Sequence, residues 1–331
     1  MRYFFSLICV VLISSARLGA QAPAGSAVAP AASPAPAPAE FAGYAAHRVY
    51  DSKRKRITDF EAMVASLARA DIVFLGEQHD DPRTHQLQAA VLEGIARRRE
   101  GALVLALEMF ERDVQPTLDA YLARNSAEPD FLAASRPWPN YRTDYRPLVE
   151  FARARGWPVV AANVPRRLAS LVSRGGLAAL DTLSPAVRAL IAKDISCPRD
   201  EYWDRFRETM GDMSGHGMQL TPEQLQATVW RIYEAQCVKD ETMAESVAAA
   251  FTARGVPVIH ANGSFHSDYR LGTVSRVKRR LPSASIAVVS FVPVSDLDQV
   301  DGKARRKLGD FVVFTLATPK PMATTPVPPA R

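Results

Sequence analysis

Six short apolar runs recur along the 331-residue chain. Within each run the apolar positions are continuous and do not alternate with polar ones, which indicates strands buried on both faces, as in a parallel sheet covered by helices. The runs are DIVFL (71–75), LVLAL (103–107), PVVAA (158–162), PVIHA (257–261), IAVVS (286–290) and FVVFTL (311–316).

Helical patterns lie between these runs. From Pro82 to Arg99 apolar residues recur every three or four positions. Asp80 or Asp81 can cap this helix, because the residue before the first turn accepts a hydrogen bond from a free backbone N–H. A second helical pattern over 145–155 precedes the third run. Strands that alternate with helices predict an α/β fold with a mostly parallel sheet flanked by helices.

The interval 166–255 contains no strand candidate. Its periodicity predicts helices alone, and we expect an all-helical insertion or lid that stands on the sheet. The expected helices cover 167–174, 185–193, 198–213 and 221–254, the last of which is long enough to be interrupted.

The N-terminal residues 1–22 have the pattern of a secretory signal peptide. Arg2 precedes an apolar stretch, and Ala20, Gln21 and Ala22 match the A-x-A cleavage site. An uncleaved anchor helix is the alternative, but the apolar core is short for one. No later run has the length of a membrane helix, so we expect no membrane span after cleavage and a secreted or periplasmic location.

Residues 23–42 and 318–331 are rich in Pro, Ala and other small residues. Segments of this composition cannot bury a core, so they are predicted to be a disordered linker and a disordered tail. The folded domain is therefore expected over 43–317.

Charge does not indicate a nucleic-acid partner. The formal net charge is +6, and +4 remains when Arg2 and Arg17 are removed with the signal peptide. The basic residues form four short groups that each flank an apolar segment, which is typical of solvated helix faces. The groups are RKR (54–56), ARRR (96–99), VKRR (277–280) and ARRK (304–307).

Two cysteines, Cys197 and Cys237, remain after signal cleavage. In an oxidising compartment they could form a disulfide, which the loop-entropy relation values at about 3–4 kcal/mol. Two isolated cysteines are a poor metal site. The sequence alone does not decide whether their Cα atoms are close enough to pair.

Polar residues follow four of the predicted strands. The first run is followed by Gly76–Glu77–Gln78–His79, and the second by Glu108. Asn163 follows the third run, and the fourth is followed by Asn262, Gly263 and then His266. Ligands bind outside the carboxyl ends of the strands in open parallel sheets, so we expect these groups to line one cleft.

Simpler interpretations exist for several of these residues. Glu77 or His79 could merely cap the helix that follows them. His260 lies inside an apolar run, which favours a buried imidazole with a structural hydrogen bond. His85 is expected on the surface. The glycines at 76 and 263 are expected to allow a sharp exit from the strand and a close approach of backbone to a ligand.

The chain resembles the ChaN-like haem-binding uptake domain of the Tiki superfamily, an erythromycin-esterase/ChaN-like fold, from about Ala70 to about Leu281. That superfamily carries two Gly-x-x-His sites with a glutamate between them, which here fall on Gly76–His79, Glu108 and Gly263–His266. Phe265 departs from the Gly-Asn-Gly-His form of the second site. The matching motifs are GEQHDDPRTHQLQ, ALEMFERDVQPTLDAYL, DYRPLVEFARARGWPVVAANVPRRL, AQCVKDETMAESV and NGSFH.

The resemblance implies an exported haem-binding protein with a role in haem or iron uptake, with haem as cofactor and partner, and it allows a homodimer. A haem site needs an apolar slot, an axial donor and cations near the propionates. His216, among methionines, and Tyr269 are candidate axial ligands. Asn163 and Arg166 are candidates for binding an anionic group, although Arg166 could equally be a solvated helix start.

The wider superfamily also resembles metal-dependent proteases and erythromycin esterases, which implies a hydrolase as the alternative. Its catalytic residues would be Glu77, His79, Glu108 and His266. His79, Glu108 and His266 could hold a divalent metal ion with an open position. Without a metal, His79 would act as general base, oriented by Glu108, while His266 polarises the substrate.

Overall fold

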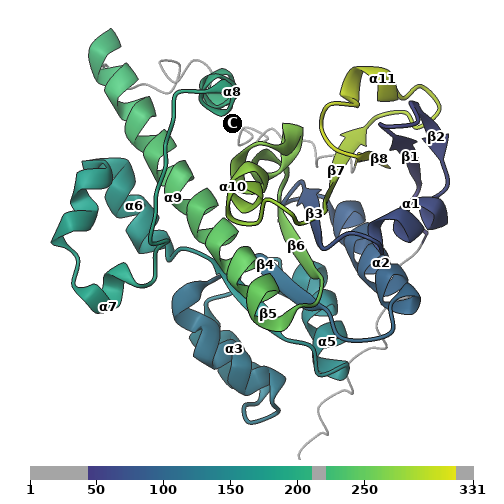
Figure 1. Ribbon diagram of the computed structural model, residues 1–331, viewed down its shortest axis with the longest axis horizontal. Coiled ribbons are helices and arrows are strands. Elements are labelled where there is room, and N and C mark those ends of the chain that lie inside the picture. Colours follow the sequence, from purple (N-terminus) through teal and green to yellow (C-terminus); the bar gives the residue numbers. More distant parts are fainter. Residues whose placement is uncertain (1–43, 211–220, 318–331) are drawn as a thin grey trace, which may run out of the picture. The chain divides into compact units, whose positions relative to one another are not determined.

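The chain folds around one eight-stranded sheet that is parallel in its centre (Figure 1). The computed structural model describes residues 44–210 and 221–317. Each of the six predicted strands is present, and β1 and β2 add an antiparallel edge. In spatial order the strands are β2 (Arg56–Thr58), β1 (His47–Asp51), β8 (Phe311–Leu316), β7 (Ile286–Val294), β3 (Ile72–Glu77), β6 (Val258–Gly263), β4 (Val104–Glu111) and β5 (Val159–Asn163).

The helices follow the predicted alternation, with Asp81 accepting from the backbone N–H of Arg83 as the N-cap of the first long helix. Within 166–210 and 221–255 no residue is in a strand, as expected. The α-helices are α1 (Phe60–Leu67), α2 (Pro82–Arg98), α3 (Gln115–Leu122), α4 (Glu128–Ser135), α5 (Arg146–Ala154), α6 (Arg166–Gly175), α7 (Pro185–Arg188), α8 (Glu201–Met210), α9 (Pro222–Arg254), α10 (Gly272–Arg280) and α11 (Gly302–Arg305). Shorter turns are η1 (Arg112–Val114), η2 (Tyr141–Tyr145), η3 (Leu177–Thr182), η5 (Ser264–His266) and η6 (Asp268–Arg270).

Both faces of the central strands are buried, which explains their continuous apolar sequences. In β3, Val73 and Leu75 belong to the core cluster that includes side chains of α1, α2 and α5. Ile72 and Phe74 belong to a second cluster with side chains of α9 and α10. Successive side chains of a strand point to opposite faces, so one run fills two cores.

The long helix α9 is unbroken over its 33 residues, from a capping box at Thr221 and Gln224 to a left-handed C-cap at Gly255. The interruption that its length allowed is absent. Its C-terminal half packs on the sheet through Met243 and Val247, as expected of helices that stand on the sheet. None of the described helices is long and apolar enough to cross a membrane.

The expected helix over 185–193 ends after one turn, at Arg188. Hydrogen bonds of side chains replace the helical ones in the residues that follow. The Arg188 guanidinium donates to the carbonyls of Ala192 and Lys193. The side chain of Thr242, distant in sequence, accepts from the Ala192 N–H. Periodicity cannot reveal such a long-range partner.

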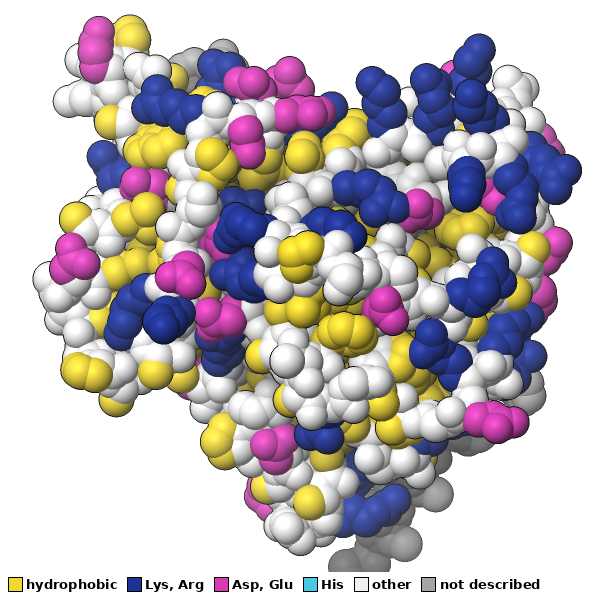
Figure 2. Space-filling model, viewed as in Figure 1, with side chains coloured by type: hydrophobic (Ala, Val, Ile, Leu, Met, Phe, Trp, Pro, Cys, Tyr) yellow, Lys and Arg dark blue, Asp and Glu magenta, His cyan; other side chains and the backbone are white. Residues whose placement is uncertain are grey.

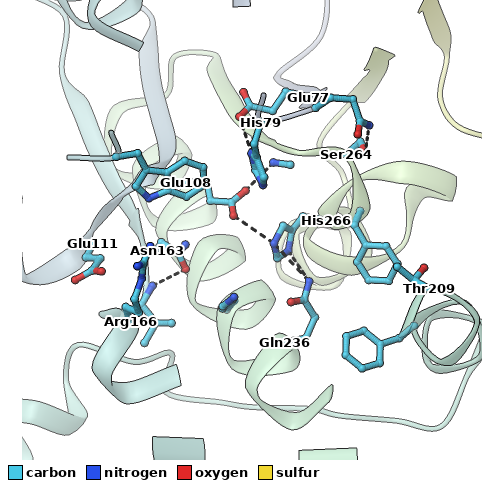
Figure 3. Close-up of a pocket in the computed structure, with 17 residues that line it drawn as sticks. Glu77, His79, Glu108, Glu111, Asn163, Arg166, Thr209, Gln236, Ser264 and His266 are labelled. Atoms are coloured by element: carbon cyan, nitrogen blue, oxygen red, sulfur yellow. Dashed lines mark hydrogen bonds and ion pairs between the residues drawn. The ribbon is translucent and has the colours of Figure 1, made fainter. Parts of the chain in front are cut away.

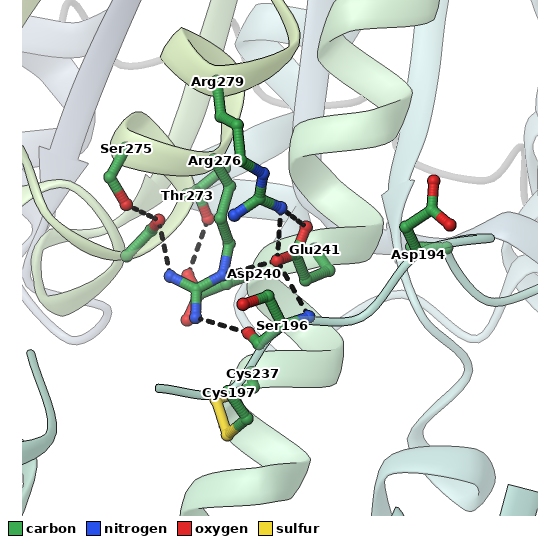
Figure 4. A network of polar contacts seen from close by, with 12 residues as sticks. Asp194, Ser196, Cys197, Cys237, Asp240, Glu241, Thr273, Ser275, Arg276 and Arg279 are labelled. Carbon is green, nitrogen blue, oxygen red and sulfur yellow. Dashed lines mark hydrogen bonds and ion pairs between the residues drawn. A yellow bond between two sulfur atoms is a disulfide. The ribbon is translucent and has the colours of Figure 1, made fainter. Parts of the chain in front are cut away.

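A disulfide joins Cys197 to Cys237, with the two Cα atoms 5.5 Å apart. It ties the segment that precedes α8 to the middle of α9 (Figure 4). Next to it on α9, the buried carboxylate of Glu241 receives Arg279 and Arg280, each at 2.6 Å, and Arg276 at 3.3 Å. These three arginines lie on α10, so Glu241 fixes α10 against α9.

Candidate functional site

A cavity of about 440 Å³ lies at the carboxyl ends of β3, β4, β5 and β6 (Figure 3). Glu77, His79, Glu108 and His266 all line it, so the structure brings the four strand-end residues together. Phe206 from α8 and Gln236 and Lys239 from α9 also contribute to its walls. The convergence predicted from the strand order of a parallel sheet is confirmed.

Glu77 and His79 form one hydrogen-bonded pair. The buried Glu77 carboxylate accepts from His79 Nδ1 at 2.9 Å, from the Tyr145 hydroxyl at 2.7 Å and from Gln88 Nε2 at 2.8 Å. Glu77 therefore anchors an imidazole and is not a helix cap. With Nδ1 committed to Glu77, the lone pair of the neutral imidazole lies on Nε2 of a side chain that is 48% exposed.

Burial lowers the pKa of His79, but the hydrogen bond to Glu77 and the charge of Glu108 outweigh this effect and leave the pKa raised. Trp138 packs edge-on against the ring, with 4.8 Å between the two centroids. His79 thus combines a fixed orientation with contact to the cleft.

Glu108 and His266 form a second group, completed by Asp240 of α9. His266 Nδ1 donates to Asp240 at 2.8 Å, and Nε2 lies 3.4 Å from the Glu108 carboxylate. The other oxygen of Glu108 accepts from the backbone N–H of Gly263 at 2.7 Å. All three side chains are buried, so their charges interact strongly.

Burial by itself lowers the pKa of the His266 imidazole. The negative charges of Glu108 and Asp240 outweigh burial and raise that pKa to about 10. For Glu108, burial raises the pKa, but the His266 charge holds it well below the usual range. Both ring nitrogens of His266 therefore face carboxylates, which favour the charged imidazolium.

The two motif glycines make room for neighbouring side chains. A Cβ on Gly263 would lie 2.7 Å from His79 Cε1 and Nε2. A Cβ on Gly76 would lie 2.6 Å from the Ser267 hydroxyl. Strands β3 and β6 are neighbours, and Glu77 lies opposite Gly263. The glycine of each strand therefore leaves room for a side chain from the turn that follows the other strand.

Asn163 and Arg166 line the same cavity. The side-chain oxygen Oδ1 of Asn163 accepts from the Val164 N–H at 2.8 Å, so this side chain shapes the turn after β5. Arg166 is exposed at the start of α6. No hydrogen bond or ion pair to a described residue engages its side chain or that of Lys239, so both cations are available to a ligand.

Of the two candidate axial ligands, Tyr269 does not line this cavity. Tyr269 lines a neighbouring cavity of about 450 Å³, where the Arg205 guanidinium lies 3.4 Å from its ring centroid. The backbone at Tyr269 is left-handed, and its side chain lies outside the cleft that holds His266. His216 lies outside the described residues.

Sequence comparison identifies the family. The family described as "Haem-binding uptake, Tiki superfamily, ChaN" matches residues 63–277. The chain belongs to this ChaN family. The match includes both Gly-x-x-His sites, Glu108 and Asp240.

The chain is similar to solved structures, one of which, at a TM-score of 0.57, shows the same fold. A structure titled "Cofacial heme binding to ChaN of Campylobacter jejuni" has a TM-score of 0.57 at 18% identity and covers 82% of this chain and 97% of its own. A mutant of the erythromycin esterase EreC, in its open conformation, has a TM-score of 0.43 at 13% identity over 75% of this chain and 77% of its own.

A plant relative is also similar in sequence. The "Protein RETICULATA-RELATED 5, chloroplastic" of Arabidopsis thaliana is 24% identical over 264 residues, which cover 76% of this chain and 35% of the plant protein. The chain thus spans about a third of the length of this relative.

Metal ligation by His79, Glu108 and His266 does not fit the ChaN-family site. Among the described residues no group of three or more His, Cys, Asp or Glu side chains is arranged to hold a metal ion. The physical reason is that both ring nitrogens of His266 face carboxylates, so of the three residues only His79, through Nε2, has a ring nitrogen open to a ligand.

Several residues of the site escaped sequence reasoning. Asp240, Gln236 and Tyr145 contact the histidines or their carboxylates, and His85 is buried beside Glu77 instead of lying on the surface. Gln236 and Asp240 are one helical turn apart, so polar residues at this spacing in α9 were an available signal. No comparable pattern points to Tyr145 or His85.

Proposed function

We propose that this ChaN-family chain binds haem in the cleft at the carboxyl ends of β3–β6. The single observation that carries the proposal is His79, whose Nδ1 is fixed by buried Glu77 while Nε2 faces the cleft without a described hydrogen-bond partner. This is the arrangement that orients a neutral imidazole for coordination to iron. Haem would supply the redox-active iron.

The other walls fit a porphyrin in chemical character. Trp138, Phe206 and Phe265 supply apolar and aromatic surface. Arg166 and Lys239 supply cations for the two propionates, and Asn163 shapes the turn that leads to Arg166. Such a mixture of apolar walls and a few placed polar groups is typical of cofactor sites.

Hemin titration of three single variants tests the proposal. His79→Ala should abolish the saturable Soret shift, whereas Tyr269→Phe, in the neighbouring cavity, should leave it unchanged. His216→Ala tests the axial ligand predicted from the sequence. Haem binding in this cleft is refuted if His79→Ala binds hemin as tightly, and with the same spectrum, as the unaltered chain.

We also propose export of the protein and a role in haem or iron uptake. The Cys197–Cys237 disulfide supports an oxidising compartment, because such bonds are rare where thiols are kept reduced. The N-terminal pattern of Arg2, an apolar core and Ala20–Gln21–Ala22 supports secretion. N-terminal sequencing of the mature protein from a periplasmic extract checks the export and the cleavage after Ala22.

Hydrolysis with His79 as general base is the second candidate. The Glu77–His79 pair is the observation that favours it, since a carboxylate that fixes Nδ1 leaves Nε2 to accept a proton. Glu108 forms an ion pair with His266 and accepts from the Gly263 N–H, so in this scheme it would hold those two groups in position. An esterase and peptidase panel that shows no activity lost on His79→Ala eliminates this candidate.

A further inference from the structure

Two basic segments that are far apart in the sequence form one surface. The β1–β2 hairpin carries Lys53, Arg54, Lys55 and Arg56, and α11 with the two residues after it carries Lys303, Arg305, Arg306 and Lys307. All eight side chains are exposed. In Figure 2 Lys and Arg side chains gather over α11 and the hairpin; we call these eight residues the cationic face.

Tight packing holds the two segments together. Gly302, the first residue of α11, lies against the ring of buried Tyr50 so closely that a Cβ would be 2.1 Å from Tyr50 Cδ2. Leu308 and Phe314 pack in the same cluster. The cationic face is therefore a fixed feature of the fold and not a chance approach of two loops.

Few acidic groups neutralise this face. Asp51 is buried and pairs with Arg54, and Asp301 accepts from the Ala304 N–H at the start of α11. Asp298 pairs with Arg48 beside the face. Lys53, Lys55 and Lys303 make no side-chain hydrogen bond or ion pair with any described residue.

The centre of the cationic face is hollow and partly apolar. A cavity of about 460 Å³ is lined by three cations, Lys55, Lys303 and Arg306, and by one carboxylate, Asp301. Tyr50, Ile57 and Val300 supply apolar lining. Ile57 is 47% exposed, which is unusual among the large apolar side chains of the described part. Cations surrounding apolar surface match a bilayer, which presents anionic headgroups above acyl chains.

We propose that the cationic face binds an anionic phospholipid bilayer, with a headgroup phosphate in the cavity beside Ile57. Nucleic acid is the weaker partner, because the ring of Tyr50 is buried and none of the residues lining this cavity offers an exposed aromatic ring for base stacking. Docking by this face is independent of haem binding in the cleft.

Vesicle co-sedimentation of the full chain tests the proposal. The chain should bind mixed phosphatidylcholine/phosphatidylglycerol vesicles more tightly than phosphatidylcholine vesicles, and high salt should remove the difference. The N-terminal segment, with Arg2 and Arg17, is present in every variant, so its contribution cancels when variants are compared on the same vesicles. Each cation neutralised at the face should weaken the phosphatidylglycerol-dependent binding about fivefold.

The test variant carries Lys53→Gln, Lys55→Gln, Lys303→Gln and Arg306→Gln and should lose about 100-fold or more. The matched control removes the same charge from exposed arginines elsewhere, at Arg124, Arg142, Arg174 and Arg254, and should lose far less. Equal losses in the two variants would show a net-charge effect and overturn the proposal. Binding that does not depend on phosphatidylglycerol would also overturn the proposal. Tighter binding of single-stranded RNA than of vesicles at the same ionic strength would do so as well.

Discussion

His266 is the residue at which charge and burial compete most strongly. Its imidazole is only 5% exposed, and the two carboxylates beside it, Glu108 and Asp240, are buried as well. An isolated buried charge is costly, but here one cation serves two anions, and each anion has a further donor in the Gly263 N–H or the Thr273 hydroxyl. Glu108, His266 and Asp240 therefore stabilise the site only when all three are present.

Replacement of His266 by Gln should lower the free energy of unfolding by about 3–5 kcal/mol at neutral pH, because two buried carboxylates lose their cation. The folded pKa of about 10 lies above the ordinary 6.5. The contribution of His266 is thus fully present below pH 6.5 and is lost as the pH rises through about 10. Urea unfolding of both proteins across this range measures the difference.

The stability of the unaltered chain should fall more steeply toward alkaline pH than that of His266→Gln. His47→Gln, outside the cleft, serves as the control for loss of an imidazole. Parallel pH dependences of the His266 variant and the unaltered chain would contradict a charged His266.

Gly263→Ala tests the contact between the two Gly-x-x-His sites. The new methyl group would lie 2.7 Å from the His79 ring, so the imidazole must turn away from its hydrogen bond with Glu77. We expect hemin affinity to fall about tenfold or more, since a displaced axial ligand loses its orientation. Gly175→Ala at the end of α6 provides the matched control, and unchanged affinity in Gly263→Ala would show that the contact has no role in binding.

At the scale of elements, the apolar runs predicted the six central strands because burial on both faces leaves a continuous signal. The antiparallel strands β1 and β2 were missed for the opposite reason. They are short, β2 is largely exposed, and the cations at 53–56 dominate the local composition. Strand β1 pairs with β8, which comes from the far end of the chain, so this pairing depends on a segment distant in sequence.

The Cys197–Cys237 bond is the clearest element-scale determinant of stability. It closes a loop with a sequence separation of 40, for which the loop-entropy relation gives about 4 kcal/mol. The Cys197→Ser/Cys237→Ser variant should be less stable by roughly 3–4 kcal/mol in urea unfolding. Reduction of the unaltered chain should produce the same loss and leave the double variant unaffected; a reduced chain as stable as the oxidised one would contradict this assignment.

At the scale of the whole molecule, the core clusters lie within residues 45–314, and each draws on segments distant in sequence. A chain restricted to 43–317 should therefore unfold at the same Tm as the full chain. Differential scanning calorimetry of the two chains makes the comparison. A lower Tm in the shorter chain, by several degrees, would mean that the flanking residues contribute to the fold.

The sequence by itself determined the α/β class, the six buried strands and the strand-end residues of the cleft, because these depend on local periodicity and on where each strand stops. Tertiary structure alone decided the rest. Asp240 reaches His266 from α9, Tyr145 reaches Glu77 from the helical turn before α5, and Tyr269 turns into another cavity. Such contacts depend on how distant segments pack, and no pattern within one segment records them.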